Sequence, residues 1–294
     1  MRGRNSLITG LLWTSPWWLG FLLLLAGPMV VSLYISFCDY PLLQPPVFVG
    51  LANYQQLVHD SVFHKAVWNT VVFAVTSIPI GTVLAVLLAI LLNQRVRGQA
   101  FFRACIFVPT IVPLVAAGVV WMWMMNPEYG LLSTSLRAVG VVQPPLWLES
   151  PRWAMVSLVM VSLWFVGSPV VIYLAGLQEI PEELYEAAKL DGASASRQLW
   201  HVTLPGISPV ILFNVIMGII TAWQVFALPY MMWRTRPGPD RVTYFYTMYL
   251  FDNAFSYLKM GYASALAWVQ FLIILALTGV VFLLSRRTVH YRGV

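Results

Sequence analysis

Six stretches of this chain contain no Asp, Glu, Lys or Arg and are each long enough to cross a membrane. A hydrocarbon core of about 30 Å requires about 20 helical residues. The six stretches run over residues 11–37, 66–92, 104–125, 153–177, 206–233 and 262–285. Because a backbone in lipid must satisfy its own hydrogen bonds, uninterrupted apolar runs of this length form helices, whereas barrel strands would alternate polar and apolar residues. We therefore expect an all-α integral membrane protein with six transmembrane helices.

The composition excludes a soluble domain and gives little support to nucleic-acid binding. The chain is 60% hydrophobic and 10% charged, against roughly 25% charged residues in an ordinary soluble domain. Its net charge of +6 comes mainly from scattered arginines rather than from basic runs, so no nucleic-acid partner is expected. The basic residues instead report on membrane topology.

The distribution of basic residues predicts which side faces the cytoplasm, because cytoplasmic loops carry more Lys and Arg. One side collects ten of them, and the other collects seven: Arg2, Arg4, Arg95, Arg97, Arg103, Lys189, Arg197, Arg286, Arg287 and Arg292 against Lys65, Arg137, Arg152, Arg234, Arg236, Arg241 and Lys259. We expect both termini on the first side, in the cytoplasm. The first apolar stretch exceeds the apolar core of about 7–15 residues in a signal peptide, so we interpret it as a retained span.

Prolines predict bends within two of the spans. Pro28 lies inside the first stretch, where it predicts a tolerated kink. Pro109 and Pro113 remove two hydrogen-bond donors from one face of the third stretch, so this helix is expected to bend.

The most charged segment of the chain begins at Ile180 and predicts a short helix of about three turns. Pro181 suits the first helical position, and Glu182 and Glu183 suit the positive end of the helix dipole. Gly192 can end the helix in a left-handed conformation.

A second short helix is expected to follow directly. Either Ser194 or Ser196 can cap it, and it runs towards Leu204, where Pro205 is expected to end it. The two helices form a helix-turn-helix between two apolar spans.

Glu186-Ala187-Ala188, then Gly192, Val202 and Leu204-Pro205, follow one another at a characteristic spacing. The pattern resembles the EAA loop of ABC importer permeases, with Val202 at a position that usually holds Ile. The text from Pro181 to Pro209 resembles the carbohydrate branch of that family, the maltose and glycerol-phosphate type. The resemblance implies a type I ABC importer permease fold as a single transmembrane domain over residues 1–294. It also implies that the loop at about 178–205 couples to a separate ATPase, with these coupling residues: Glu186, Ala187, Ala188, Asp191, Gly192, Leu204 and Pro205.

The fifth stretch holds the predicted substrate-path residues. Asn214 and Gln224 are amides within an apolar span, and a buried amide needs a hydrogen-bond partner on a neighbouring helix or in a wet cavity. The segment from Trp223 to Phe226 resembles the part of sugar permeases that contributes amide and aromatic side chains to the sugar site. The predicted path residues are therefore Asn214, Trp223, Gln224 and Phe226.

Two polar segments outside the spans leave interpretations open. His59, Asp60 and His64 are a weak metal signal, and a solvated interfacial helix without a metal site is the expectation. Gly238-Pro239 keeps the turn that the family has after its fifth span, but Arg236 and Pro237 depart from it. Arg234, Arg236 and Arg241 serve either as interfacial anchors or as contacts for a docking or anionic partner.

The chain shows no catalytic set and no phosphate-binding Gly-x-x-x-x-Gly-Lys-Ser/Thr motif. We therefore expect no enzyme activity and no cofactor bound by this chain, with ATP and magnesium on the partner ATPase. The resemblance implies a bacterial-type inner-membrane location, an ATPase dimer, an extracytoplasmic binding protein and membrane lipid as partners. The segment Gly50-Leu51-Ala52-Asn53-Tyr54 is similar to the first partner of permease heterodimers, which implies a second permease chain.

The absence of intramembrane charge favours a neutral substrate, so import of a sugar or oligosaccharide is the predicted function. Two alternatives remain open at this point. One is an ABC permease for glycerol phosphate esters. The other is a secondary transporter of a small polar solute, although such a transporter should place an acidic residue at the membrane midplane.

Overall fold

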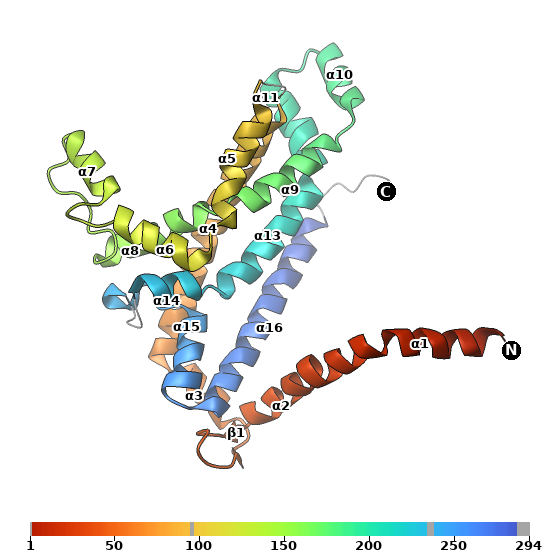
Figure 1. Cartoon of the computed structure of the whole chain (residues 1–294), viewed down its shortest axis with the longest axis vertical. Helices are drawn as coiled ribbons and strands as arrows, with labels where there is room; N and C mark the ends of the chain where they lie inside the picture. Colours follow the sequence, from red (N-terminus) through yellow and green to blue (C-terminus); the bar gives the residue numbers. More distant parts are fainter. Residues whose placement is uncertain (1, 95–96, 234–237, 287–294) are drawn as a thin grey trace. The chain divides into compact units, whose positions relative to one another are not determined.

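The structure is a computed structural model that describes residues 2–94, 97–233 and 238–286. Helices dominate it, together with one short antiparallel pair of strands (Figure 1). The chain divides into two compact units, which are described separately. The first contains residues 1–61 and 250–272, and the second contains residues 62–249 and 273–294.

The first unit contains the N-terminal helix and the beginning of the last helix. Its elements are α1 (Arg2–Phe21), the π-helical segment η1 (Leu22–Ala26), α2 (Gly27–Ser36), β1 (Cys38–Asp39), β2 (Val47–Phe48), α3 (Ala52–His59), the π-helical segment η4 (Asp252–Ser256) and the first part of α16 (Met260–Ser285). Pro28 lies at the start of α2, directly after the π-helical turn. A proline donates no backbone hydrogen bond and crowds the carbonyl four residues earlier, and the wider π turn accommodates it.

The segment Gly50–Tyr54 ties α3 to the end of α2. Gly50 has a φ of 61°, which favours glycine. The amide nitrogen of Asn53 donates to the carbonyls of Ser36 and Cys38 at 2.9 Å each, and the Tyr54 hydroxyl lies 2.7 Å from the Ser36 hydroxyl. These residues therefore have a clear structural role within the first unit.

The polar residues around His59 make hydrogen bonds within the protein. Nδ1 of His59 lies 2.9 Å from the Gln55 carbonyl oxygen, and the Tyr262 hydroxyl donates to Asp60 at 2.6 Å. The described residues contain no group of three His, Cys, Asp or Glu side chains that could hold a metal ion. Asp60 thus acts as the acceptor that fixes Tyr262 at the start of α16.

The second unit is a helical bundle that contains the segment predicted to couple to an ATPase, residues 178–205. Its elements are α4 (Ser61–Asn93), α5 (Gln99–Ile111), α6 (Leu114–Met124), α7 (Leu131–Ala138), α8 (Pro151–Leu163), α9 (Gly167–Gln178), α10 (Glu182–Leu190), α11 (Ala195–Gln198), the π-helical segment η2 (Leu199–Thr203), α12 (Leu204–Gly206), α13 (Ser208–Trp223), α14 (Ala227–Trp233), the 3₁₀ turn η3 (Pro239–Arg241) and α15 (Tyr246–Phe251). A core cluster joins α4 to α9 through Ala85, Ala89, Tyr173 and Leu177. Figure 1 shows α10 and α11 at one end of this unit, beyond α5 and α9.

Three helical stretches are individually long and apolar enough to cross a membrane: Thr9–Ser36, Ser61–Asn93 and Met260–Ser285. Three further pairs of helices meet the same test together but are bent. The angles are 99° between α5 and α6, 49° between α8 and α9, and 65° between Ala195–Gly206 and α13. By length and composition, the described residues therefore hold three spans, or up to six if each bent pair is counted as one span. The number six agrees with the sequence prediction, but the pair that corresponds to the fifth span begins at Ala195 and ends at Trp223 rather than covering residues 206–233.

The bend between α5 and α6 confirms the prediction from the third stretch. Val112 is extended, with φ −65° and ψ 128°, because the ring of a following proline disfavours the helical conformation of the preceding residue. Pro113 then begins the new helix direction. Pro109 lies inside α5 and does not interrupt it.

The fifth predicted stretch contains a break that was not predicted from the sequence. Residues 206–233 do not form one helix, because α13 ends at Trp223 and α14 begins at Ala227. Pro229 cannot donate to the carbonyl of Val225, and its ring would crowd that carbonyl in a continuous helix. The helix therefore breaks at Gln224–Phe226.

The expectation that Pro205 ends the second short helix is wrong, because the chain stays helical through Pro205 to Gly206. Residues 199–203 form a π-helical segment and the chain remains helical from Leu204 to Gly206. The bend follows at Ile207, which has φ −99° and ψ 6°. The wider π turn places the carbonyl of His201 away from the proline ring, so the helix passes through Pro205.

The loop after α14 is fastened to α4 by a buried amide. The Asn69 side-chain nitrogen donates to the carbonyl of Arg241 at 2.7 Å and to that of Tyr244 at 3.0 Å. The neighbouring Thr70 hydroxyl accepts a hydrogen bond from the backbone N–H of Tyr246 at 3.0 Å. These contacts fix the backbone that leads into α15.

Candidate coupling loop and transport cavity

The helix α10 has the predicted punctuation at both ends. Pro181 occupies the N-cap position instead of the first helical position, so the helix begins at Glu182, one residue later than expected, and Glu182 and Glu183 lie in its first turn. Gly192 has a φ of 71°, and its N–H donates to the Lys189 carbonyl at 3.0 Å. The N–H of residue 193 donates to the Ala188 carbonyl at 2.9 Å. This pair of bonds is a Schellman motif, which satisfies carbonyls at the end of the helix.

The second short helix begins with the capping that the sequence predicts. The Ser194 hydroxyl accepts from the backbone N–H of Arg197 at 3.4 Å. The Gln198 side-chain nitrogen donates back to the Ala193 carbonyl at 2.9 Å. The turn between α10 and α11 is therefore held from both sides.

The residues of the EAA pattern divide between an exposed face and a partly buried face. Glu186, Ala187, Asp191 and Gly192 are exposed, and Ala188 is half-buried. On the other side, Leu204 packs against the core cluster of α4 and α9, and Pro205 is half-buried beside it. The structure thus places the predicted residues on one helix-turn-helix but in two different environments.

Tyr185 connects the exposed helix to the buried face. Its ring packs against the core cluster together with Val202, and its hydroxyl lies 3.0 Å from the Thr203 hydroxyl. Thr203 is buried within η2. These contacts connect α10 to the segment that leads into α13.

The loop also exposes large apolar side chains. Leu190 at the end of α10 is 89% exposed, Trp200 in η2 is 66% exposed, and Leu184 is 50% exposed. Exposed apolar groups in an otherwise charged loop are typical of a protein contact surface.

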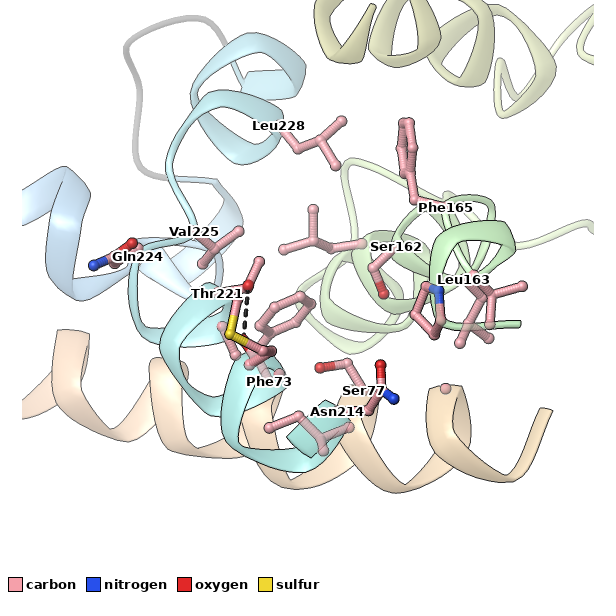
Figure 2. A pocket seen from close by; sticks show the side chains of 18 of the residues that line it. Phe73, Ser77, Ser162, Leu163, Phe165, Asn214, Thr221, Gln224, Val225 and Leu228 are labelled. Atoms are coloured by element: carbon pink, nitrogen blue, oxygen red, sulfur yellow. Dashed lines mark hydrogen bonds between the residues drawn. The ribbon is translucent and has the colours of Figure 1, made fainter. Parts of the chain in front are cut away.

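A cavity of about 670 Å³ lies within the second unit. Its walls come from α4, α8, α9, α13 and α14, with Leu114 of α6 and residues Phe165 and Val166 before α9 (Figure 2). This volume lies in the range of about 300–1,000 Å³ that small-molecule sites occupy.

The cavity lining is apolar with a limited set of neutral polar groups. No charged residue is among the described residues that line it. The polar members are Ser77 and Thr82 from α4, Ser162 from α8, Tyr173 from α9, Asn214 and Thr221 from α13, and Gln224 after α13. Such a surface can bind hydroxyl groups and apolar C–H surfaces but offers no counter-ion to a charged ligand.

Tyr173 has a fully buried side chain at the edge of this cavity. Its hydroxyl lies near Thr82 but meets no hydrogen-bond partner of adequate geometry among the described residues. A buried hydroxyl without a partner is costly, and in this structure the hydroxyl itself is shielded although the residue lines the cavity.

The structure brings three of the four predicted path residues to the cavity. Asn214, Gln224 and Phe226 line it. The Asn214 side-chain nitrogen donates to the Val210 carbonyl at 2.9 Å, which leaves the amide oxygen as an acceptor. Gln224 is exposed, and Figure 2 shows it at the margin of the lining residues.

The fourth predicted path residue, Trp223, is buried and does not line the cavity. Only 3% of its surface is exposed, and its ring centre lies 6.0 Å from that of Tyr246. Its carbonyl accepts from the Thr247 hydroxyl at 3.1 Å. The structure thus places Trp223 where it supports the end of α13.

Sequence reasoning did not identify the hydroxyl residues of the cavity. Thr221 and Ser162 donate to carbonyls of their own helices, at 2.8 Å and 2.7 Å. Ser and Thr in apolar spans commonly do this, so their presence carries little sequence signal. Arg234 and Arg236 lie outside the described residues, and Arg241 has an exposed side chain.

A comparison with known families agrees with the loop and with the helical architecture. The family described as "Binding-protein-dependent transport system inner membrane component" matches residues 77–290. The chain belongs to this permease family. Membership of this family rules out the alternative that the chain is a secondary transporter.

The sequence matches to similar proteins extend over most of the permease. The probable ABC transporter permease protein YesP of Bacillus subtilis is 34% identical over 292 residues, covering 99% of this chain and 94% of that protein. The sulfoquinovosyl glycerol transport system permease protein SmoG of Agrobacterium fabrum is 35% identical, covering 88% and 84%. The permease is therefore a membrane transport subunit of an ABC importer and not an enzyme.

A solved structure shares the fold of the permease. It is a chain of a bacterial ABC transporter involved in the import of the acidic polysaccharide alginate, with a TM-score of 0.81 and 21% identity. The match covers 97% of this chain and 96% of that one. The fold is thus that of an ABC importer permease, as the sequence predicts.

Proposed function

We propose that this permease carries a neutral sugar or oligosaccharide through the cavity between α4, α9 and α13. The observation that carries the proposal is the lining of that cavity, which offers hydroxyls, two amides and aromatic rings but no charged side chain among the described residues. Hydroxyl and amide groups exchange hydrogen bonds with a polyol, and the rings of Phe73 and Phe226 can cover its C–H surfaces.

The names of the relatives support a carbohydrate substrate without fixing which one. SmoG is named for a sulfoquinovosyl glycerol, a sugar derivative. A glycerol phosphate ester would need cations at its phosphate, and the described cavity provides none. The neutral lining therefore favours a neutral sugar over the phosphate-ester alternative.

The loop at 178–205 supports coupling to a separate ATPase. Its exposed side presents Glu186 and Leu190, and its buried side holds Tyr185 and Leu204 against the core of the bundle. An ATPase that moves α10 would therefore move η2 and α13, which forms one wall of the cavity. ATP and magnesium belong to that partner in this proposal.

The remaining subunits complete the proposed importer. We propose two ATPase subunits, a second and different permease chain, and an extracytoplasmic binding protein that delivers the sugar. The permease then forms one transmembrane domain over residues 1–294 of a bacterial inner membrane, with both termini and the loop at 178–205 in the cytoplasm.

The first test is to identify the proteins that co-purify, in mild detergent, with the tagged permease from its native membrane. We expect a P-loop ATPase, a second permease and a binding protein. Their recovery with the wild type, and loss of the ATPase from the double variant E186A/G192V, supports the coupling proposal. The exposed variant E183A serves as the matched control and should retain the ATPase. Recovery of the same set from all three would contradict the role of the loop.

The substrate class is tested with the binding protein that co-purifies. Neutral mono-, di- and oligosaccharides and glycerol-3-phosphate are screened by calorimetry, and those that bind are tested for uptake into proteoliposomes that hold the full complex. Binding and ATP-dependent uptake of a neutral sugar is the expected result. Selective uptake of glycerol-3-phosphate would overturn the neutral-sugar proposal while leaving the coupling proposal intact.

A further inference from the structure

Arg103 is a charged residue in the mainly apolar helix α5, and it has no hydrogen-bond partner among the described residues. It lies one turn into α5, which is part of a bent pair apolar enough to cross a membrane. Its Nε atom is buried, and no hydrogen-bond partner or carboxylate meets it in the part of the chain that the structure describes. A guanidinium in such a position is costly unless an anion or acceptor binds it.

A cleft of about 250 Å³ opens beside this side chain, between α5 and α9. Arg103 and Gln178 are its polar members, and its walls include Ile106, Phe107, Val171 and Leu174. Gly167 permits the two helices to approach, because a Cβ at this position would collide with the Ile106 carbonyl. The cleft thus combines one cationic end with a long apolar wall.

We propose that this cleft binds an anionic phospholipid, with its phosphate at Arg103 and an acyl chain along the apolar wall. The planar guanidinium matches the geometry of phosphate oxygens, and the amide of Gln178 adds a donor at the same end. Basic pockets between transmembrane helices are suited to lipid headgroups. An acyl chain accounts for the walls, which a free phosphate or a protein carboxylate would leave uncovered.

The test counts bound lipids by native mass spectrometry on the full chain, purified with the subunits that accompany it and supplemented with phosphatidylglycerol. The wild type should retain at least one phosphatidylglycerol after detergent washing. The variant R103Q should bind it at least about tenfold more weakly, because the charged guanidinium that donates to the lipid phosphate is lost. The exposed R97Q is the matched control, because it removes the same charge six residues away and should bind as the wild type does.

A second variant tests the apolar wall and leaves the charge in place. Val171 lines the cleft and is 49% exposed, whereas the adjacent Ile172 is 39% exposed and does not line it. V171W should expel the lipid and I172W should not. Equal retention by R103Q and R97Q would overturn the site, and so would equal retention by V171W and I172W.

Two further measurements distinguish a lipid headgroup from a free phosphate ion as the ligand of Arg103. Inorganic phosphate at millimolar concentration should not displace the lipid, and phosphatidylcholine should be retained several-fold less than phosphatidylglycerol. Displacement by inorganic phosphate would identify a phosphate-ion site instead. Loss of lipid in the assembled complex but not in the isolated chain would show that a partner protein covers the cleft, and would also overturn the proposal.

Discussion

The hydroxyl of Tyr185 on α10 lies 3.0 Å from the hydroxyl of Thr203 in the π-helical segment η2. This contact spans the turn between the two short helices of the loop at 178–205. It joins the helix that faces outwards to the segment that continues into the cavity wall.

Removal of the Tyr185 hydroxyl should weaken this mechanical connection while leaving the ring packed on the core. We expect Y185F to lower the amount of substrate transported per ATP hydrolysed, with a loss of about 1 kcal/mol for one hydrogen bond. Uptake and ATP hydrolysis are measured together in proteoliposomes. Tyr129, which is 68% exposed, provides the control Y129F, and an equal effect of both substitutions would refute the connection.

Replacement of Gly192 by alanine should strain the end of α10. Its φ of 71° is unfavourable for a side chain, and the cost is about 1 kcal/mol. We expect G192A to bind the ATPase less tightly in a pull-down titration and G192N to restore part of the binding, because asparagine tolerates this conformation.

Gly140 offers a control with the same kind of strain at a different place. It has a φ of 97°, and a Cβ there would meet nothing within 4 Å. G140A should therefore destabilise the protein to a similar degree without changing ATPase binding. If both variants lose the ATPase equally, the effect of G192A comes from stability alone.

The phenol of Tyr173 should act on the substrate rather than on the fold. Because its hydroxyl has no hydrogen-bond partner of adequate geometry among the described residues, Y173F should leave the melting temperature unchanged or raise it slightly. The apparent affinity for the transported sugar should fall about two- to tenfold, the value of one neutral hydrogen bond, because we expect the shielded hydroxyl to reach the sugar when the cavity opens during transport. A drop in melting temperature with unchanged transport affinity would assign Tyr173 a structural role.

Asn69, unlike Tyr173, should be needed for the stability of the fold. Its amide satisfies the carbonyls of Arg241 and Tyr244, and N69A would leave the buried carbonyl of Tyr244 unpaired at a cost of about 1–3 kcal/mol. Thermal unfolding in detergent should show a clear decrease in melting temperature. N93A at the exposed end of the same helix should show none, and the prediction fails if the two variants unfold at the same temperature.

The spans and the coupling loop could be predicted because their signals are local. A run without charge requires a helix in lipid, and Pro181 and Gly192 mark the ends of α10 through their own backbone preferences. The positions of the bends were harder to predict from the sequence. Pro79 lies inside the continuous 33-residue helix α4, whereas the bend at Pro113 reaches 99°, so packing around a proline decides its effect.

The cavity could be predicted only in part, because its composition depends on which helix faces meet. Amides are rare in apolar spans, so Asn214 and Gln224 stood out. Tyr173 did not, since an aromatic residue in a span more often packs in the core or at the membrane interface. The burial of Trp223 against Tyr246 joins residues that are distant in sequence, and no local pattern predicts such a contact.

The break between α13 and α14 changes what the main chain itself offers to a ligand. The carbonyl of Val225, a lining residue, cannot receive the usual helical hydrogen bond because position 229 is a proline. This oxygen is an acceptor that no side-chain exchange at position 225 removes. An alanine scan of the cavity side chains therefore leaves this main-chain acceptor in place and does not report on it.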